Sequence, residues 1–305
     1  MALKDIKTKI EATKRMHTVT RAMEAVSAVK MRKTQEHERA GRPYARAALS
    51  ILTRLSGSGD LSRHPLAEHR AVRKTALVLI TSDKGLAGAL NSNVIKAALK
   101  AVSGKTKDGV LVYAIGRKGQ DFFRGRGYTI VTYQENSRDD VSLASMEELS
   151  QKLSSGFHTH NFDEVIAAYS NFRSTFEQEA VVRKLLPLSV KAMAELVRDI
   201  QPVKGKWSDE PMLEAPPAYS TDAGVEGDEQ LLELLVPRLV AVSLYTMLSE
   251  AKASEHSARM VAMKSASDKS KEVARDLTRV YNKLRQAAIT REVSEIVGGR
   301  EALAT

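Results

Sequence analysis

The sequence predicts an α/β protein in which two long helices, one at each end of the chain, pair as an antiparallel coiled coil beside an α/β globular domain. Three observations predict it: a helical pattern over residues 2–56, another over residues 228–297, and alternating strand and helix patterns over residues 70–200. A first helix of roughly 55 residues and a second of roughly 60, counted from Arg238, would extend about 80 and 90 Å, more than the width of a small domain. A helix of that length cannot cover its apolar face on a compact core and needs a partner helix.

The pattern of residues 2–56 predicts one helix that Gly41-Arg42-Pro43 kinks without ending. Its apolar positions recur in steps of three and four, with one shift after residue 10, as expected when a 3.6-residue helix drifts against a 3.5-residue seam. We expect the seam to contain Leu3, Ile6, Ile10, Met16, Val19, Met23 and Val26.

The second long helix has Pro237 near its predicted start and is expected to end at Gly298-Gly299. Its middle is rich in Ala and Ser, which would allow a partner helix to approach closely. We expect the antiparallel pairing to bring Ile10 and Ala288 together. The predicted seam contains Leu244, Met247, Leu248, Ala251, Ser254, Ala258, Val261, Ser265, Leu277, Val280, Leu284 and Ala287. The alternative, two unrelated helices that each pack on a domain of their own, is disfavoured because such long patterns are uncommon in globular folds.

The middle of the chain alternates apolar, β-branched runs with helical stretches, which predicts an α/β layer with a largely parallel sheet. Strands are expected at Thr75–Thr81, Val110–Ile115, Tyr128–Tyr133, Asp163–Tyr169 and Phe176–Leu186, and helices at residues 93–102, 120–124 and 142–157. Residues 201–227 are rich in proline and predict a loop or foot. The predicted organisation is therefore a helix over 1–56, a domain over 70–200, a foot loop over 201–227 and a helix over 228–305.

The composition excludes several classes of protein. The chain has no cysteine, which excludes disulfides, Cys-ligated zinc and iron–sulfur clusters. It has no run of about 18 uncharged apolar residues, so we expect no membrane-spanning helix. The first residues enter a helical pattern directly and resemble neither a signal peptide nor a transit peptide, so we expect the protein to stay in the compartment where it is made.

The glycine-bearing segment Ser82–Asn91 follows the first predicted strand, where a phosphate could bind backbone N–H groups. It matches neither G-x-G-x-x-G nor the P-loop pattern, which favours a tight structural turn. The histidines have no metal-ligand spacing, and no nucleophile motif occurs. We therefore expect no catalytic residues, no cofactor and no metal.

The net charge of +10 is concentrated in residues 1–55, which hold thirteen Lys and Arg against five Asp and Glu. A basic helix indicates an acidic partner surface. Two rival functions follow: a basic coiled-coil protein that binds nucleic acid would explain the charge, and a nucleotide-dependent enzyme would explain the glycine turn. Neither accounts for two long helices at opposite ends of the chain.

Four segments carry a specific resemblance to a known family. Leu3–Lys7 with Val19–Arg32 resembles the N-terminal helix of F-type ATP synthase γ subunits, and Ser82–Asn91 resembles that family's S-D-[RK]-G-L-x-G-x-[LYF]-N turn. Ala253–Asp268 and Tyr281–Glu292 resemble its C-terminal signature. The resemblance implies a central rotor shaft: an antiparallel coiled coil inside a hexamer of α and β subunits, with a Rossmann-like domain at its base.

The resemblance further implies partners and contact positions. The partners would be the α and β subunits, the ε subunit and the membrane c-ring, with no nucleic acid, at the cytoplasmic face of a bacterial plasma membrane. Rotor–stator contacts would fall on Met23, Lys30, Lys33, Arg285, Gln286 and Thr290, and a foot contact on Glu210. Lys105 and Lys107 are expected on an exposed loop away from these contacts. Arg300–Thr305 departs from the family pattern by extending the C-terminus.

Overall fold

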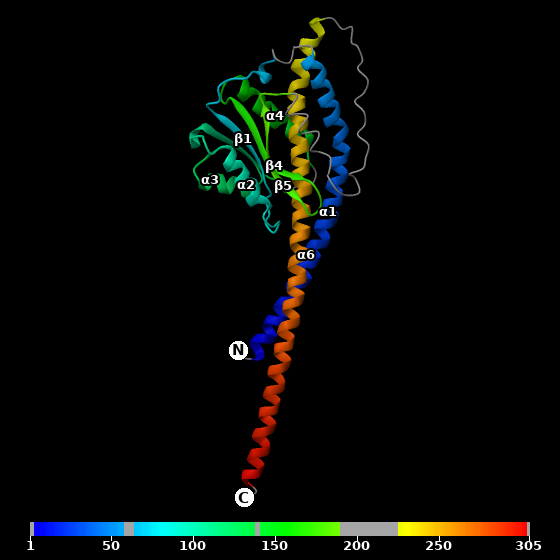
Figure 1. The fold of residues 1–305 in the computed structure, drawn as a ribbon, viewed down its shortest axis with the longest axis vertical. Coiled ribbons are helices and arrows are strands. Elements are labelled where there is room, and N and C mark those ends of the chain that lie inside the picture. Colours follow the sequence, from blue (N-terminus) through cyan, green and yellow to red (C-terminus); the bar gives the residue numbers. More distant parts are fainter. Residues whose placement is uncertain (1–2, 58–63, 138–140, 190–224, 304–305) are drawn as a thin grey trace. The chain divides into compact units, whose positions relative to one another are not determined.

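The computed structural model describes residues 3–57, 64–137, 141–189 and 225–303, and the side chains of residues 3–36, 64–137, 141–189 and 236–297. The chain forms two compact units, Met1–Val26 with Met260–Thr305, and Ser27–Arg259. Two long helices, α1 (Leu3–Gly57) and α6 (Val225–Leu303), contribute residues to both units (Figure 1). The predicted combination of two terminal helices and a central α/β domain is confirmed.

The ends of the two long helices differ in part from the prediction. Helix α1 continues through Gly41-Arg42-Pro43, as expected, and Pro237 lies inside α6, near its start, also as expected. The prediction that α6 ends at Gly298-Gly299 is wrong, because the helix continues to Leu303. Glycine inside a helix costs only about 1 kcal/mol relative to alanine, which does not end a helix of this length. Residues 201–224 of the predicted foot loop lie outside the described residues, and residues 225–227 belong to α6.

The sheet lies in the unit Ser27–Arg259. Its strands run in the order β3-β2-β1-β4-β5, and β1 to β4 are mutually parallel. β5 pairs antiparallel with β4, because a tight connection returns the chain directly to its neighbour. The strands are β1 (Thr75–Ile80), β2 (Val110–Ile115), β3 (Thr129–Gln134), β4 (Glu164–Phe172) and β5 (Gln178–Leu186). The predicted strands and the largely parallel sheet are confirmed.

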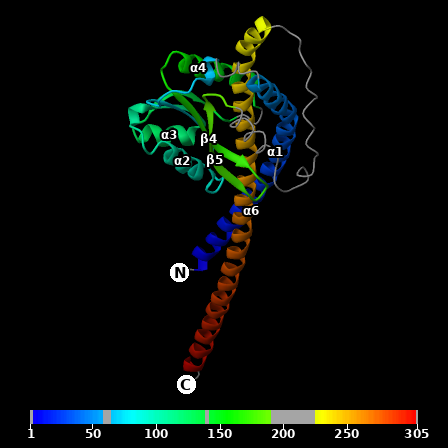
Figure 2. The same ribbon diagram turned by 45° about the horizontal axis from the view of Figure 1, so that its top comes forward.

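Alternate residues of β1, β2, β4 and β5 face two separate hydrophobic clusters. Helices α2 (Leu90–Ala101) and α3 (Arg117–Gly125) cover one face, where Leu77 and Leu79 of β1 point. Helix α4 (Leu143–His158) and part of α6 cover the other, where Val78 and Ile80 point (Figure 2). Two short 3-10 helices, η2 (Pro65–Ala67) and η3 (Lys107–Gly109), complete the described elements of this unit.

In the other unit, residues of α1 and α6 form a helix pair. The two helices lie side by side and run in opposite directions (Figures 1 and 2). Nδ1 of His17 on α1 lies 3.0 Å from the carbonyl oxygen of Ser267 on α6, which joins the two helices at that level. The antiparallel coiled coil expected from the sequence is therefore present.

Candidate functional site

The glycine-bearing turn after β1 is closed by its own hydrogen bonds. The backbone N–H of Ser82 donates to Oδ1 of Asn91 at 3.0 Å, and Nδ2 of Asn91 donates to Oγ of Ser82 at 2.7 Å. Oγ of Ser82 in turn donates to the carbonyl of Lys84 at 2.6 Å. The polar residues at both ends of the turn therefore hold its backbone conformation.

Asp83 connects this turn to the ends of the two neighbouring strands. Its carboxylate accepts from the backbone N–H of Arg117, which follows β2, at 2.8 Å and from that of Asn136, which follows β3, at 2.7 Å. Nδ2 of the buried Asn136 then donates to the carbonyl of Thr81 at 2.7 Å. The carboxyl ends of β1, β2 and β3 are thereby fixed to one another.

Gly116, which precedes α3, is required by close packing. Its φ of +95° lies in a region that favours glycine, and a Cβ there would lie 1.9 Å from the carbonyl oxygen of Thr81. The first N–H groups of α3 already have protein partners: Lys118 donates to the carbonyl of Ser82 at 3.1 Å, and Gly119 to Oγ1 of Thr81 at 2.9 Å. The helix terminus beside the turn therefore bonds to the protein itself.

Helix α6 crosses the carboxyl edge of the sheet where a ligand would bind in a related fold. In open α/β sheets, ligands bind beyond the strand ends where successive strands are added in opposite directions, which here lies between β1 and β4. Ser257 donates to the carbonyl of Thr175, just after β4, at 2.6 Å, and Ser254 to that of Ser170 at 3.1 Å. The guanidinium of Arg259 lies 3.4 Å from the carbonyl of Gly85, in the turn after β1. The crevice is thus occupied by the chain's own helix.

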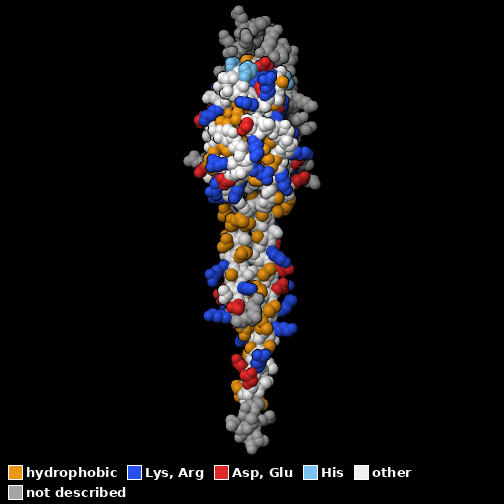
Figure 3. Space-filling view, turned by 90° about the vertical axis from the view of Figure 1, so that its left-hand side faces the viewer, with side chains coloured by type: hydrophobic (Ala, Val, Ile, Leu, Met, Phe, Trp, Pro, Cys, Tyr) orange, Lys and Arg blue, Asp and Glu red, His pale blue; other side chains and the backbone are white. Residues whose placement is uncertain are grey.

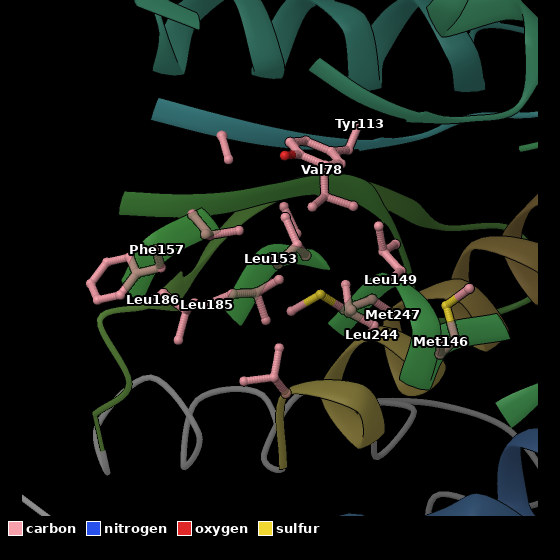
Figure 4. Packing of buried hydrophobic residues seen from close by; sticks show 14 of the residues in the cluster. Val78, Tyr113, Met146, Leu149, Leu153, Phe157, Leu185, Leu186, Leu244 and Met247 are labelled. Carbon is pink, nitrogen blue, oxygen red and sulfur yellow. The ribbon is translucent and has the colours of Figure 1, made fainter. Parts of the chain in front are cut away.

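An apolar face attaches the preceding part of α6 to the domain. Leu244 and Met247 pack on Met146, Leu149 and other side chains of α4 and the sheet (Figure 4). Burial of one such side chain stabilises the folded state by about 1.5–3 kcal/mol. This face of α6 comprises Val236, Leu239, Val240, Leu244, Met247, Leu248 and Ala251.

Charged residues follow this apolar face on α6 and are buried as well. Lys252 is 3% exposed and donates to the carbonyl of Asn136. Arg259 is 8% exposed and pairs with Glu255 at 2.8 Å. Burial raises the pKa of the nearby Tyr169 hydroxyl well above its ordinary value, and the negative charge of Glu250 raises it further. We call these three residues the polar mount: Lys252 contacts the loop after β3, Arg259 contacts the turn after β1, and Glu255 pairs with Arg259.

Two carboxylates hold the opposite, amino-terminal edge of the sheet. Burial raises the pKa of Asp163, but hydrogen bonds from the N–H groups of Lys74 and Arg73 and from Arg70 outweigh it and leave the pKa lowered. Burial also raises the pKa of Glu164, but its contacts with Lys105 and Thr75 outweigh burial and leave the pKa lowered.

These contacts correct one expectation. Lys105 is not on an exposed loop, because its Nζ contacts Glu164 and Thr75, whereas Lys107 is exposed.

The seam of the helix pair is more polar than the sequence pattern predicts. The prediction that Met16, Val19 and Val26 lie in the seam is wrong, because these side chains are 60%, 57% and 55% exposed. Other predicted seam positions on α6 are also wrong. Ser265, Val280, Leu284 and Ala287 are exposed, and Leu244, Met247, Leu248 and Ala251 pack on the α/β domain. The inward positions are Ile6, Ile10, Thr13, His17 and Thr20 on α1, and Met263, Ser267, Ser270, Ala274 and Leu277 on α6.

The contact between His17 and Ser267 also sets the register. Counting seven residues in opposite directions places Ile10 level with Ala274. Ala288 then lies about 21 Å further along α6, so the expected approach of Ile10 and Ala288 is wrong.

The outer surface of this helix pair carries many apolar side chains, as Figure 3 shows among the charged ones. On α6 most of them lie towards the C-terminal end, which continues beyond the level of the first described residue of α1. The exposed large hydrophobic residues of the unit are Met16, Val19, Val26, Val273, Val280, Leu284, Ile289, Val293, Ile296 and Val297.

The six contact positions implied by the resemblance fall into separate groups. Arg285, Gln286 and Thr290 are exposed within two turns of α6, where Thr290 Oγ1 donates to the carbonyl of Gln286 at 3.0 Å. Met23 is half-buried and lies level with residue 261 in this register, about 36 Å from Arg285 along the pair. The remaining two, Lys30 and Lys33, belong to the other unit and are half-buried and exposed, respectively. Glu210 lies outside the described residues.

Two further findings concern the described residues only. They contain no group of three His, Asp or Glu side chains arranged to hold a metal ion. None of their helices combines the length and the hydropathy that a membrane crossing requires.

Comparisons with known proteins agree on one family. A family model described as ATP synthase matches residues 2–303. The chain is 35% identical to an ATP synthase gamma chain of Macrococcus caseolyticus over 305 residues, covering 99% of each chain. It is 38% identical to the ATP synthase gamma chain of Cupriavidus necator over 304 residues, covering 98% of this chain and 99% of that one.

Solved structures with a similar fold come from ATP synthases. A chain of the Euglena gracilis mitochondrial ATP synthase, from a structure of its OSCP, F1 and c-ring, matches with a TM-score of 0.67 and 19% identity, covering 99% of this chain and 94% of that one. A chain from the central stalk and c-ring of the Tetrahymena thermophila mitochondrial ATP synthase matches with a TM-score of 0.56 and 21% identity, covering 82% and 99%.

Proposed function

Because this chain belongs to the ATP synthase γ chain family, we propose that it is the central rotor shaft of a bacterial F-type ATP synthase. In this role it couples proton flow through the membrane c-ring to conformational cycling of the catalytic β subunits. An asymmetric shaft that turns inside a ring presents a different surface to each β subunit in turn. Each contact then favours one of the conformations available to that catalytic site.

The observation that carries this proposal is the exposed apolar surface of the helix pair. Small polar side chains such as Thr13, Thr20 and Ser270 face inward, while Met16 and Val19 are among the large apolar side chains that face outward. Exposed apolar surface of this extent indicates a protein partner. A surrounding hexamer of α and β subunits would cover it on all sides.

The contacts of the shaft with its stator are part of the proposal. Arg285, Gln286 and Thr290 would bind a loop of the β subunit, and Met23, Lys30 and Lys33 would form a second contact region. Met23 and Arg285, about 36 Å apart along the pair, would together hold the shaft against tilting while it turns. Glu210 would contact the ε subunit and the c-ring at the foot.

We assign no catalytic residue and no nucleotide site to this subunit. The crevice at the carboxyl ends of β1 and β4 is filled by α6, and the N–H groups of Lys118 and Gly119 bond to the protein. Titration of the purified chain with ATP, ADP and NAD should give no binding at micromolar concentration. Such binding would reopen the alternative of a nucleotide-dependent enzyme.

The proposed location is peripheral, at the cytoplasmic face of a bacterial plasma membrane, where the complex holds the subunit through the c-ring. The similarity to bacterial relatives supports this location.

A reversible cross-link tests the rotor function. The chain has no cysteine, so a single Cys at the exposed position Ala287 can be paired with a Cys in the β loop proposed to meet Arg285. A disulfide forms only when the Cα atoms lie about 4.4–6.8 Å apart, so its formation tests proximity. We expect the cross-link to abolish multi-turnover ATP hydrolysis and reduction to restore it. Full activity with the cross-link intact would contradict a rotating shaft at this position.

A further inference from the structure

The polar mount connects α6 to two loops that are themselves joined. Lys252 binds the carbonyl of Asn136 in the loop after β3, and Arg259 binds the carbonyl of Gly85 in the turn after β1. Asp83 joins these loops through its hydrogen bond from Asn136. The contacts therefore close a continuous circuit from α6 through both loops and back to α6.

The three charged residues of the mount occupy one face of the helix. Lys252, Glu255 and Arg259 are spaced by three and four residues, so their side chains project in the same direction. All three are more than nine-tenths buried. The apolar face that precedes them stabilises the packing of α6 on the domain. Hydrophobic packing is not directional, however, and does not by itself define the angle of α6 about its own axis.

Buried charges do define that angle. Turning α6 by one residue, about 100°, would move Lys252 and Arg259 away from their carbonyl partners and leave buried charges without hydrogen bonds. The cost of an unpaired buried charge is large, whereas apolar side chains can repack with smaller losses. The charged contacts thus select one rotational setting of the helix on the domain.

We propose that Lys252 and Arg259 are positioning residues that fix the rotational setting of α6 on the α/β domain, so that torque received by the domain turns the shaft without slippage. This inference rests on the proposed rotor function. It assigns the buried cations of α6 to mechanical coupling, a role separate from contact with any other subunit. Asp83 and Asn136 serve the same role by holding the two receiving loops together.

The experiment uses the complete ATP synthase, reconstituted into vesicles with this chain as its γ subunit. The measured quantity is ATP-driven proton uptake per ATP hydrolysed. The variants are Lys252→Met and Arg259→Gln, singly and together, with Lys96→Met as a matched control because Lys96 is an exposed lysine on α2. Arg259→Lys, which retains a cationic donor for Gly85, is the conservative variant.

We expect Lys252→Met to lower the proton yield per ATP by about twofold or more, because shafts in wrong settings then form a sizeable fraction of the population. The double variant should lower it further, Arg259→Lys should be intermediate, and Lys96→Met should match the wild type. A role confined to stability would reduce the amount or the melting temperature of assembled complex but leave this yield unchanged. If Lys252→Met complexes do not assemble, Arg259→Gln carries the test.

Wild-type yields in both Lys252→Met and Arg259→Gln would overturn the inference while leaving the rotor function intact. Failure of the proposed function looks different: the wild-type chain itself would then support no ATP-driven proton uptake.

Discussion

Nδ1 of His17 lies 3.0 Å from both the carbonyl oxygen and Oγ of Ser267, on the opposite helix of the pair. A polar pair inside a coiled-coil seam specifies register, because a shift of either helix leaves its polar atoms unpaired. Three inward neighbours of this pair, Thr13 and Thr20 on α1 and Ser270 on α6, are small and polar and favour no register over another. The pair between His17 and Ser267 therefore accounts for the alignment of α1 with α6.

This register predicts distances between exposed positions. Spin labels at Glu11 and Arg275, in the assembled complex, should be offset by only about 3 Å along the pair, whereas labels at Glu11 and Ile289 should be offset by about 24 Å. We expect the second distance to exceed the first by about 10 Å, as measured by electron paramagnetic resonance. Equal distances would contradict the register and with it the role of His17.

The outward apolar side chains predict a mutation that affects the complex but not the chain. Val19→Glu should lower steady-state ATP hydrolysis of the assembled complex severalfold, because it places a charge on a surface that the proposed ring covers. The urea midpoint of the isolated chain should stay within error, since Val19 is exposed there. Val131→Glu, at an exposed position on β3 in the other unit, is the control for charge alone. Loss of stability in the isolated Val19→Glu chain would indicate that this residue packs within the subunit.

Charge reversal at Lys30 and Lys33 should weaken coupled activity more than charge reversal at Lys96 and Lys100. The first pair would face acidic stator surface, and the second lies exposed on α2. Exposed ion pairs contribute only about 0–1 kcal/mol each, so a partial loss is expected. ATP-driven proton uptake measures it, and equal losses in both double variants would remove the electrostatic argument for the first pair.

Acid should destabilise the sheet edge that Asp163 and Glu164 hold. The pKa of each is lowered in the folded state, so each stabilises the fold fully above its ordinary pKa and loses that contribution as pH falls through the folded value. We expect the free energy of unfolding to fall steeply below about pH 4. Asp163→Asn should lower stability at neutral pH and make the acid dependence shallower, measured by urea unfolding between pH 3 and 7. An unchanged slope would mean that Asp163 is not held by these hydrogen bonds.

The sequence predicts the structure well where the hydrophobic residues are also the buried ones. The runs that form β1, β2 and β4 are buried on both faces and therefore appear as continuous apolar segments. In the long helices many large hydrophobic residues are exposed instead. Periodicity alone does not distinguish apolar residues that face a partner helix from those that face outward, so it places Met16 and Val19 on the wrong surface.

The residues of the polar mount could not be identified from the sequence for a related reason. Lys252 and Arg259 stand in an Ala- and Ser-rich helix, where a cation ordinarily lies on a solvated surface. Their burial depends on carbonyl groups of Asn136 and Gly85, more than a hundred residues away in the chain. The one available signal was the abundance of small residues around them, which indicates that another part of the backbone comes close.

The difference between side chains that face the opposite helix and side chains that face outward also affects what happens when this subunit is placed in the ATP synthase of another organism. Ser267 and Thr20 face the opposite helix of the same chain. The effect of a substitution there is therefore the same in any host. Val19 and Val293 are exposed, so the effect of a substitution there depends on how well the side chain fits the other subunits of the host. A hybrid enzyme carrying this chain should thus be limited by the fit of its outer surface, and a few surface replacements copied from the host's own subunit should restore it without any change to the seam.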